Sequence, residues 1–170
     1  MVVVDASPLI VLSKIDRLAL LKAVYREAWI TPRVRQEVVE RGLPVDPVGS
    51  RRVAEAITAG WIHEAELSAA EKRQARALVA ESRLGGGETE TLALARSRNA
   101  TVIVDDKAAR MVAERLDPRY LGTLGFLLES SARGHLAADG LEEAIRDLTQ
   151  VLWLSPAVVA EVLTKARETR

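Results

Sequence analysis

The chain has 170 residues, 48% of them hydrophobic and 28% charged, so it is long enough to bury the core of one domain and too apolar for a disordered chain. Its 24 basic and 24 acidic residues cancel, so no global positive field points to a nucleic-acid partner, and the lack of cysteine excludes disulfides and thiolate metal sites. No apolar run approaches the roughly 18 residues of a transmembrane helix, and the first residues lack the basic segment of a signal peptide, so we expect a cytoplasmic protein outside the membrane.

The N-terminus reads as a strand that leads into a helix. Residues 2–4 are three valines, which favour a buried strand, and Asp5 ends this run. Ser7 can cap a following helix in which Pro8 takes the first position. An acidic residue therefore stands where a strand gives way to a helix.

A second strand and helix follow the same order. Residues 28–30 predict a short strand, and a helix begins after it at Thr31 and ends at Gly42. Val34, Glu37, Val38 and Arg41 are spaced along this helix at i, i+3, i+4 and i+7. A glutamate therefore lies beside its apolar stripe.

The third acidic segment follows the glycine cluster at 85–87. Glu88 and Glu90 stand in the first turns of the helix predicted there, and residues 101–104 predict a buried strand that ends at Asp105 and Asp106. Acidic residues again occupy a helix start and a strand end.

The rest of the chain alternates in the same way. Residues 45–50 read as a loop, 60–63 and 120–121 as strands, and helices are expected at 51–59, 68–83, 107–116, 122–133, 139–149 and 156–168. Strands that alternate with helices of this length predict an α/β fold with three layers, in which helices cover both faces of a mostly parallel sheet of four to five strands. We expect one domain over residues 1–170, with a helical C-terminal extension from about residue 139.

Ligands of such sheets bind beyond the carboxyl ends of the strands, where Asp5, Asp105 and Asp106 are expected. Carboxylates that crowd together repel one another unless a cation neutralises them. Hard oxygen ligands suit Mg²⁺ or Mn²⁺, which activates a water molecule for phosphodiester hydrolysis. The acidic residues at these special places are Asp5, Glu37, Glu88, Glu90, Asp105 and Asp106.

Each acid has a plainer explanation when it is taken singly, because aspartate caps helices and glutamate is favoured in a first helical turn. Nucleotide-binding sites are excluded more clearly, since the glycine cluster lacks the ending of a P-loop and no dinucleotide-binding motif follows the first strand.

His63 and His135 have no catalytic motif around them and are interpreted as surface or packing residues. The tryptophans are expected in the core: Trp29, Trp61 and Trp153.

At these residues the sequence resembles the PIN-domain family, the fold of toxin ribonucleases and of several RNA-processing nucleases. The resemblance covers nearly the whole chain, and its last segments are similar to a prokaryotic subfamily for which nucleic-acid binding has mostly only been proposed. It is carried by VVDASPLI (3–10), QEV (36–38), GETETLALA (87–95), VIVDDKAAR (102–110), LGTLGFLL (121–128) and GHL (134–136).

The resemblance implies that Asp5, Glu37, one acid of the glycine-led helix and one acid after the fourth strand hold Mg²⁺ or Mn²⁺. Glu90 matches the family's usual aspartate and is slightly favoured, while Glu88 belongs to the subfamily's pattern. Asp106 matches the common position after the strand, with Asp105 as an alternative or supporting ligand. Ser7 matches a small hydroxyl residue that supports the site.

The function implied is a metal-dependent endoribonuclease, with the toxin of a toxin–antitoxin pair as one role for such a protein. The resemblance also implies a small antitoxin partner and a homodimer. Six basic residues flank the acids and could hold RNA phosphates, although a solvated helix face is the plainer explanation for most of them: Arg33, Arg35, Arg83, Arg96, Lys107 and Arg110.

Two other functions compete with RNA cleavage. A catalytically weak or inactive PIN-like module that binds RNA or a protein would be favoured if the acids were splayed apart. A receiver-like phosphorylation domain also places acids at strand ends, but it needs Ser or Thr and Lys after its later strands, a layout that this chain lacks.

Overall fold

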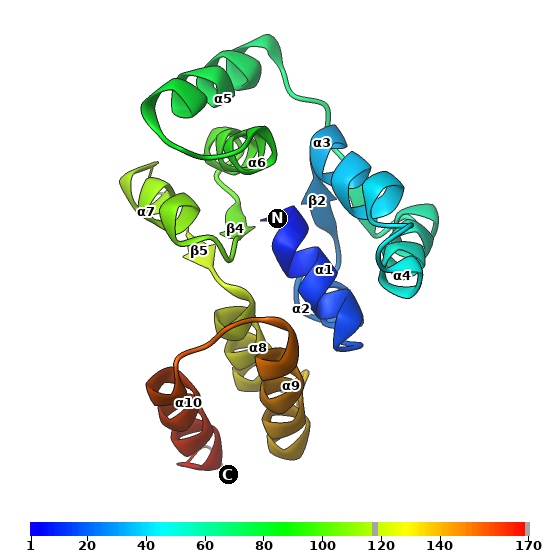
Figure 1. Cartoon of the computed structure of the whole chain (residues 1–170), viewed down its shortest axis with the longest axis vertical. Helices are drawn as coiled ribbons and strands as arrows, with labels where there is room; N and C mark the ends of the chain where they lie inside the picture. The colour runs from blue at the N-terminus through cyan, green and yellow to red at the C-terminus, as the bar shows by residue number, and fades with distance from the viewer. Residues whose placement is uncertain (117–118, 169–170) are drawn as a thin grey trace.

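The computed structural model describes residues 1–116 and 119–168 (Figure 1). Its five strands form one sheet with the order β3-β2-β1-β4-β5, and every neighbouring pair is parallel. This confirms the predicted α/β class and the parallel sheet. The strands are β1 (Val2–Val4), β2 (Ala28–Ile30), β3 (Ile62–Glu64), β4 (Thr101–Ile103) and β5 (Tyr120–Leu121).

Helices connect the strands and cover the sheet. The bounds in the N-terminal half are α1 (Ala6–Lys14), α2 (Ala19–Tyr25), α3 (Pro32–Arg35), the π-helix η1 (Gln36–Arg41), α4 (Pro47–Thr58) and α5 (Ala69–Glu81). In the C-terminal half they are α6 (Gly86–Ser97), α7 (Lys107–Leu116), α8 (Thr123–Ala132), α9 (Ala138–Val151) and α10 (Pro156–Glu168). None of these helices is both long and apolar enough to cross a membrane.

The prediction of a loop over residues 45–50 was wrong at its C-terminal end. The Asp46 carboxylate accepts a hydrogen bond from the Gly49 backbone N–H at 3.0 Å, and Pro47 follows at the first helical position. An Asp-Pro pair suits a helix start as well as a turn. Helix α4 therefore begins earlier than the apolar pattern predicts.

The alternation of side chains along β1 separates two hydrophobic clusters. Val2 and Val4 face the larger cluster, which includes buried residues of α1, α4, α8 and α9, whereas Val3 faces a second cluster with residues of α6 and α7. Helices thus cover both faces of the sheet, and Figure 1 shows α5, α6 and α7 on the side opposite α1 and α2. The three-layer arrangement follows from strands whose side chains are apolar on both faces.

The helical C-terminal part packs onto the body of the domain. Leu141, Ile145 and Leu148 of α9 belong to the larger cluster, together with Val162 of α10. Trp153, however, is 84% exposed, so the expectation of a core residue was wrong. The chain is extended at Leu152, and side chains alternate there, so Leu152 and Leu154 pack against the core while Trp153 points away.

The order of the strands places a switch point between β1 and β4. The chain runs outward from β1 through β2 to β3 and then returns to the other side of β1 at β4. Asp5 follows β1 and donates its backbone N–H to the Ile103 carbonyl at 3.0 Å, which joins the ends of the two strands. Ligands of parallel sheets bind at such a crevice, so the fold itself positions the acidic residues.

Candidate active site

A pocket of about 370 Å³ opens at the carboxyl edge of the sheet, beyond β1. The start of α1, the π-helix η1 and the start of α6 form its walls. It brings together three of the predicted acids and the predicted hydroxyl residue Ser7. The lining residues are Asp5, Ala6, Ser7, Arg33, Glu37, Arg41, Gly85, Gly86, Gly87 and Glu88.

Asp5 is the buried acid of this pocket, with 4% of its surface exposed. Its Oδ1 accepts a hydrogen bond from Thr91 Oγ1 at 3.4 Å, and the backbone of Ala6 also donates to its carboxylate. Burial is the largest cause of the rise of the Asp5 pKa to about 7, and the charges of Glu88 and Glu37 contribute to it, while the hydrogen bonds from Ala6 and Thr91 oppose it. The carboxylates are therefore close enough to disfavour one another's charge.

Glu37 reaches the pocket from a π-helix rather than from the ordinary helix that its apolar spacing predicts. Helix α3 begins where Thr31 Oγ1 accepts from the Val34 N–H, and η1 continues it over Gln36–Arg41. Such wider turns often occur at functional sites because they redirect side chains. The sequence pattern identified the helix but did not predict this change of geometry.

Two residues hold the end of the π-helix. Ser50 Oγ of α4 donates to the Val38 carbonyl at 2.9 Å, and Gly42 lies so close that an added Cβ would be 2.6 Å from the same hydroxyl and would collide with the Val38 carbonyl. A residue with a side chain at position 42 would push α4 away from η1. Gly42 therefore acts as more than a helix stop.

Glu88 is the second acid whose pKa is raised. Burial is the largest cause, and the charges of Asp106 and Glu37 add to it, while the hydrogen bond from the Gly85 N–H to Glu88 Oε2, at 2.7 Å, opposes them. That bond completes a capping interaction at the start of α6. Glu88 thus stands electrostatically between Glu37 on one side and Asp106 on the other.

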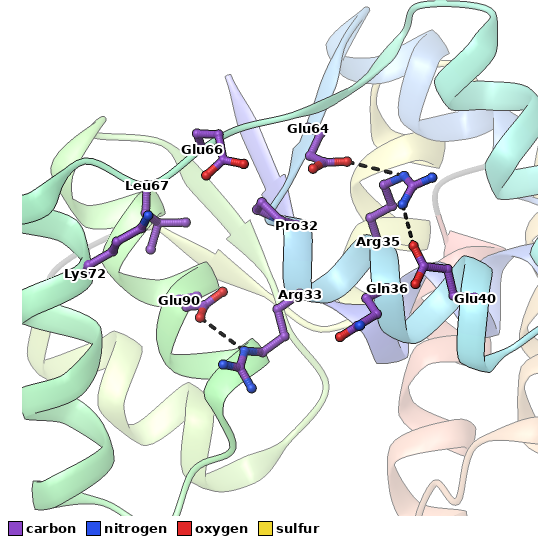
Figure 2. A pocket seen from close by; sticks show the side chains of 10 residues that line it. All are labelled: Pro32, Arg33, Arg35, Gln36, Glu40, Glu64, Glu66, Leu67, Lys72 and Glu90. Atoms are coloured by element: carbon purple, nitrogen blue, oxygen red, sulfur yellow. Dashed lines mark hydrogen bonds and ion pairs between the residues drawn. The ribbon is translucent and has the colours of Figure 1, made fainter.

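Glu90 points away from this pocket. Residues two apart on an α-helix lie about 200° apart around its axis, so Glu88 and Glu90 face different sides of α6. Glu90 Oε1 accepts a hydrogen bond from Arg33 Nε at 3.1 Å and lines a neighbouring groove (Figure 2). The sequence slightly favoured Glu90 as a ligand, but Glu88 is the acid of α6 that shares the pocket with Asp5.

The two aspartates after β4 differ in their contacts. Asp106 Oδ1 accepts from the Ala109 N–H at 2.8 Å at the start of α7, and its charge acts on Glu88. Asp105 accepts from the backbone N–H and from the hydroxyl of Thr123, both at 2.7 Å. Asp105 therefore connects the end of β4 to the start of α8, whereas Asp106 is the aspartate whose negative charge acts on an acid of the pocket, Glu88.

The contact between Asp105 and Thr123 predicts a stability effect. Thr123→Val removes a hydroxyl donor from a charged acceptor at a fully buried position, so we expect the free energy of unfolding to fall by about 1.5 to 3 kcal/mol. Urea unfolding measures this change. Thr149→Val, whose hydroxyl bonds to the Arg146 carbonyl on an exposed face, is the control and should change stability by less than about 0.5 kcal/mol. Equal effects of the two substitutions would contradict this role of Asp105.

Arg33 and Arg41 are the cations of the acidic pocket. Arg33 was among the predicted RNA-binding residues. Arg41 was not, although its position four residues after Glu37 on one helix could have indicated it. Of the other candidates, Arg35 lines the neighbouring groove and Arg110 donates to the Asp105 carbonyl at 2.8 Å. The remaining three line neither space: Arg83, Arg96 and Lys107.

The chemistry of the pocket fits a hard divalent cation, because Asp5, Glu37 and Glu88 offer carboxylate oxygens that crowd one another without it. Among residues 1–116 and 119–168, however, no group of three or more His, Asp or Glu side chains is already arranged to hold a metal ion. Glu88 Oε2 instead accepts a hydrogen bond from the Gly85 N–H. The donors are present, but their side chains are not in a coordinating arrangement.

A parallel five-stranded sheet with an acid-lined pocket at its switch point defines an α/β protein with a carboxylate site. A family model described as PIN domain matches residues 1–168. The chain belongs to the PIN-domain family, as its motifs indicated. PIN domains are generally nuclease-like and typically depend on a metal. A search of curated proteins found no match.

Proposed function

We propose that this protein is a metal-dependent endoribonuclease that hydrolyses phosphodiester bonds of RNA. The observation that supports this most strongly is the buried Asp5 carboxyl, whose pKa lies near 7 because it is desolvated and faces Glu37 and Glu88. A buried acid with a strongly raised pKa beside other acids is typical of catalytic and metal sites. Its place at the switch point of the sheet adds independent support.

Asp5, Glu37 and Glu88 are the residues that would hold Mg²⁺ or Mn²⁺, with Asp106 contributing negative charge from the end of β4. When bound, the metal supplies a water of lowered pKa and screens charge on the phosphoryl oxygens. Thr91 orients the Asp5 carboxylate through its hydroxyl. Asp5 would bind the metal as a charged carboxylate, so its carboxyl group must lose its proton before the metal binds.

Arg33 and Arg41 would hold the phosphates of the strand at the mouth of the pocket, since their guanidinium groups match phosphate oxygens. Ser7, the second residue of α1, lies beside Asp5 in the pocket and would offer a hydroxyl to the substrate or to the acids. These residues keep the phosphodiester near the carboxylates without covalent chemistry. The protein then acts by positioning and by electrostatics.

The two glutamates of α6 provide the test of this site. Glu88→Gln should lower metal-dependent RNA cleavage by about 100-fold or more, because losing a ligand costs at least as much as losing a supporting residue. Glu90→Gln should lower it by less than about tenfold, because it only frees Arg33 from an ion pair. The measurement is the rate of cleavage of structured RNA with Mg²⁺, with Mn²⁺ and with a chelator.

Both substitutions remove one charge from the same helix, so each is the matched control of the other. A larger loss of cleavage for Glu90→Gln than for Glu88→Gln would make Glu90 the metal ligand, which is the residue that the sequence slightly favoured. Cleavage that persists in the chelator would overturn a metal-dependent mechanism.

A module that binds without cutting is the second candidate. It is favoured by the finding that no group of acids in the described residues is already arranged around a metal site. RNA binding without cleavage in either metal would support it. A toxin role, an antitoxin partner and a homodimer remain proposals drawn from the resemblance.

A further inference from the structure

A second hollow of about 470 Å³, here called the side groove, adjoins the acidic pocket. It lies beyond the ends of β2 and β3, between α3 with η1 on one side and α5 with α6 on the other (Figure 2). Arg33 lines both spaces, so it stands at their boundary. The lining residues are Pro32, Arg33, Arg35, Gln36, Glu40, Glu64, Glu66, Leu67, Lys72 and Glu90.

Most charges of the side groove are already compensated. Arg35 pairs with Glu40 at 2.6 Å and with Glu64 at 3.3 Å, and Figure 2 shows it turned toward these acids, away from Arg33. Within the part of the chain that the structure describes, Glu66 and Lys72 form no ion pair. They are the acceptor and the donor available to a ligand.

The backbone of Gly86 holds Arg33 at the boundary. An added Cβ on Gly86 would lie 2.7 Å from Cζ and 2.8 Å from Nη1 of Arg33, so the guanidinium rests directly against this glycine. Its Nε donates to Glu90 on the same helix. The start of α6 thus fixes a cation between the acidic pocket and the side groove.

We propose that the side groove is the subsite for the nucleotide next to the cleaved phosphodiester. This rests on the proposed ribonuclease function. Arg33 holds the phosphate between the two spaces, Glu66 accepts hydrogen bonds from an exocyclic amino group of the base, and Lys72 contacts the phosphate that follows.

The lining chemistry favours a base over a bare phosphate inside the side groove. Four acids and three cations line it, so its interior has no excess of positive charge to attract a phosphate. Pro32 and Leu67 add apolar surface against which a base can lie, and Gln36 offers both a donor and an acceptor. Carboxylates accept hydrogen bonds from amino groups, which adenine and cytosine carry and uracil lacks.

The test measures binding apart from cleavage. In an Asp5→Asn background, fluorescence anisotropy reports the affinity for short labelled single strands of A, C or U. We expect A and C to bind about fivefold or more tightly than U, and Glu66→Ala to reduce this difference below about twofold. Lys72→Ala should weaken all three about fivefold, as expected for a phosphate contact.

Matched controls lie on the same helix as Lys72. Glu81→Ala and Arg73→Ala remove the same charges from exposed positions of α5 that do not line the side groove, and both should bind like the parent. Wild-type cleavage of the same strands is measured in parallel.

Each outcome is decisive. If the Glu66 and Lys72 variants bind RNA like the parent while the wild type cleaves it, the subsite is overturned and the ribonuclease function stands. If the wild type does not cleave but binding depends on Glu66 and Lys72, the proposed function fails and the subsite survives. If RNA neither binds nor is cleaved, both proposals fail.

Discussion

Asp5→Asn is expected to abolish metal-dependent RNA cleavage, with a loss of about 100-fold or more, comparable to or above the loss of a supporting residue of a metal site. Asparagine keeps the size of the side chain but removes the charge that a metal requires. Cleavage of RNA in Mn²⁺ measures the effect. The central acid of the pocket has no substitute, because Asp5 is the only acidic lining residue that is buried.

The same substitution should stabilise the metal-free protein. The pKa of Asp5 is about 7 in the folded state, whereas the ordinary value of 3.8 applies to the unfolded chain. Between these two pH values the folded chain holds a proton that the unfolded chain has already released. The stability from this protonated carboxyl is fully present below about pH 4 and is lost as pH rises through about 7. Above that pH the charged, uncompensated Asp5 costs on the order of a few kcal/mol, at about 1.4 kcal/mol per pKa unit.

Urea unfolding with a chelator, at about pH 5 and about pH 8, checks this sign. The advantage of the Asp5→Asn protein should grow with pH, whereas Asp16→Asn, at an exposed position, should change neither the pH profile nor cleavage. An Asp5→Asn protein that cleaves RNA normally, or that is less stable than the wild type at the higher pH, would refute this account of the site.

Mn²⁺ or Mg²⁺ should stabilise the wild type more at high pH than at low pH. A metal at about 100 times its Kd adds about 2.7 kcal/mol, which for a chain of this size raises Tm by roughly 5 to 10 °C. The proton on Asp5 competes with the metal. The affinity for the metal should therefore be about thirtyfold weaker at about pH 5.5, which is about 1.5 units below the folded pKa, than at a pH where Asp5 is fully ionised.

Thermal unfolding with metal or with chelator, at about pH 5.5 and at about pH 8, measures the effect. The Asp5→Asn protein is the control and should show little stabilisation at either pH, because its pocket lacks the buried charge. Equal stabilisation of both proteins would place the metal elsewhere on the chain. A shift that does not change with pH would show that Asp5 does not contribute to the binding step.

Much of the fold was predictable because its signals are local. The valines of β1, the apolar run of β4 and the helix from Lys107 to Leu116 appear where their side chains predict them. The direction of parallel strands then predicts that Asp5 and the aspartates after β4 meet at one edge of the sheet. The family motifs coincide with these same strand ends, and the family model covers them all.

Contacts within the site were less predictable, because they depend on how elements rotate against one another. Glu88 and Glu90 are equivalent in a helical pattern, but only Glu88 faces Asp5, since α6 turns its other side to Arg33. Asp105 and Asp106 are adjacent in sequence, yet Thr123, 18 residues away, engages only the first.

The sequence by itself determined that Asp5, Asp105 and Asp106 follow the ends of strands, because strand polarity and apolar periodicity are properties of short segments. Only the tertiary structure decided which acids share a pocket, that Glu37 sits on a π-helix held by Gly42 and Ser50, and that Trp153 is exposed. The physical reason is that these choices arise from packing between elements distant in sequence, such as η1 against α4 and α6 against α3, which local patterns do not encode.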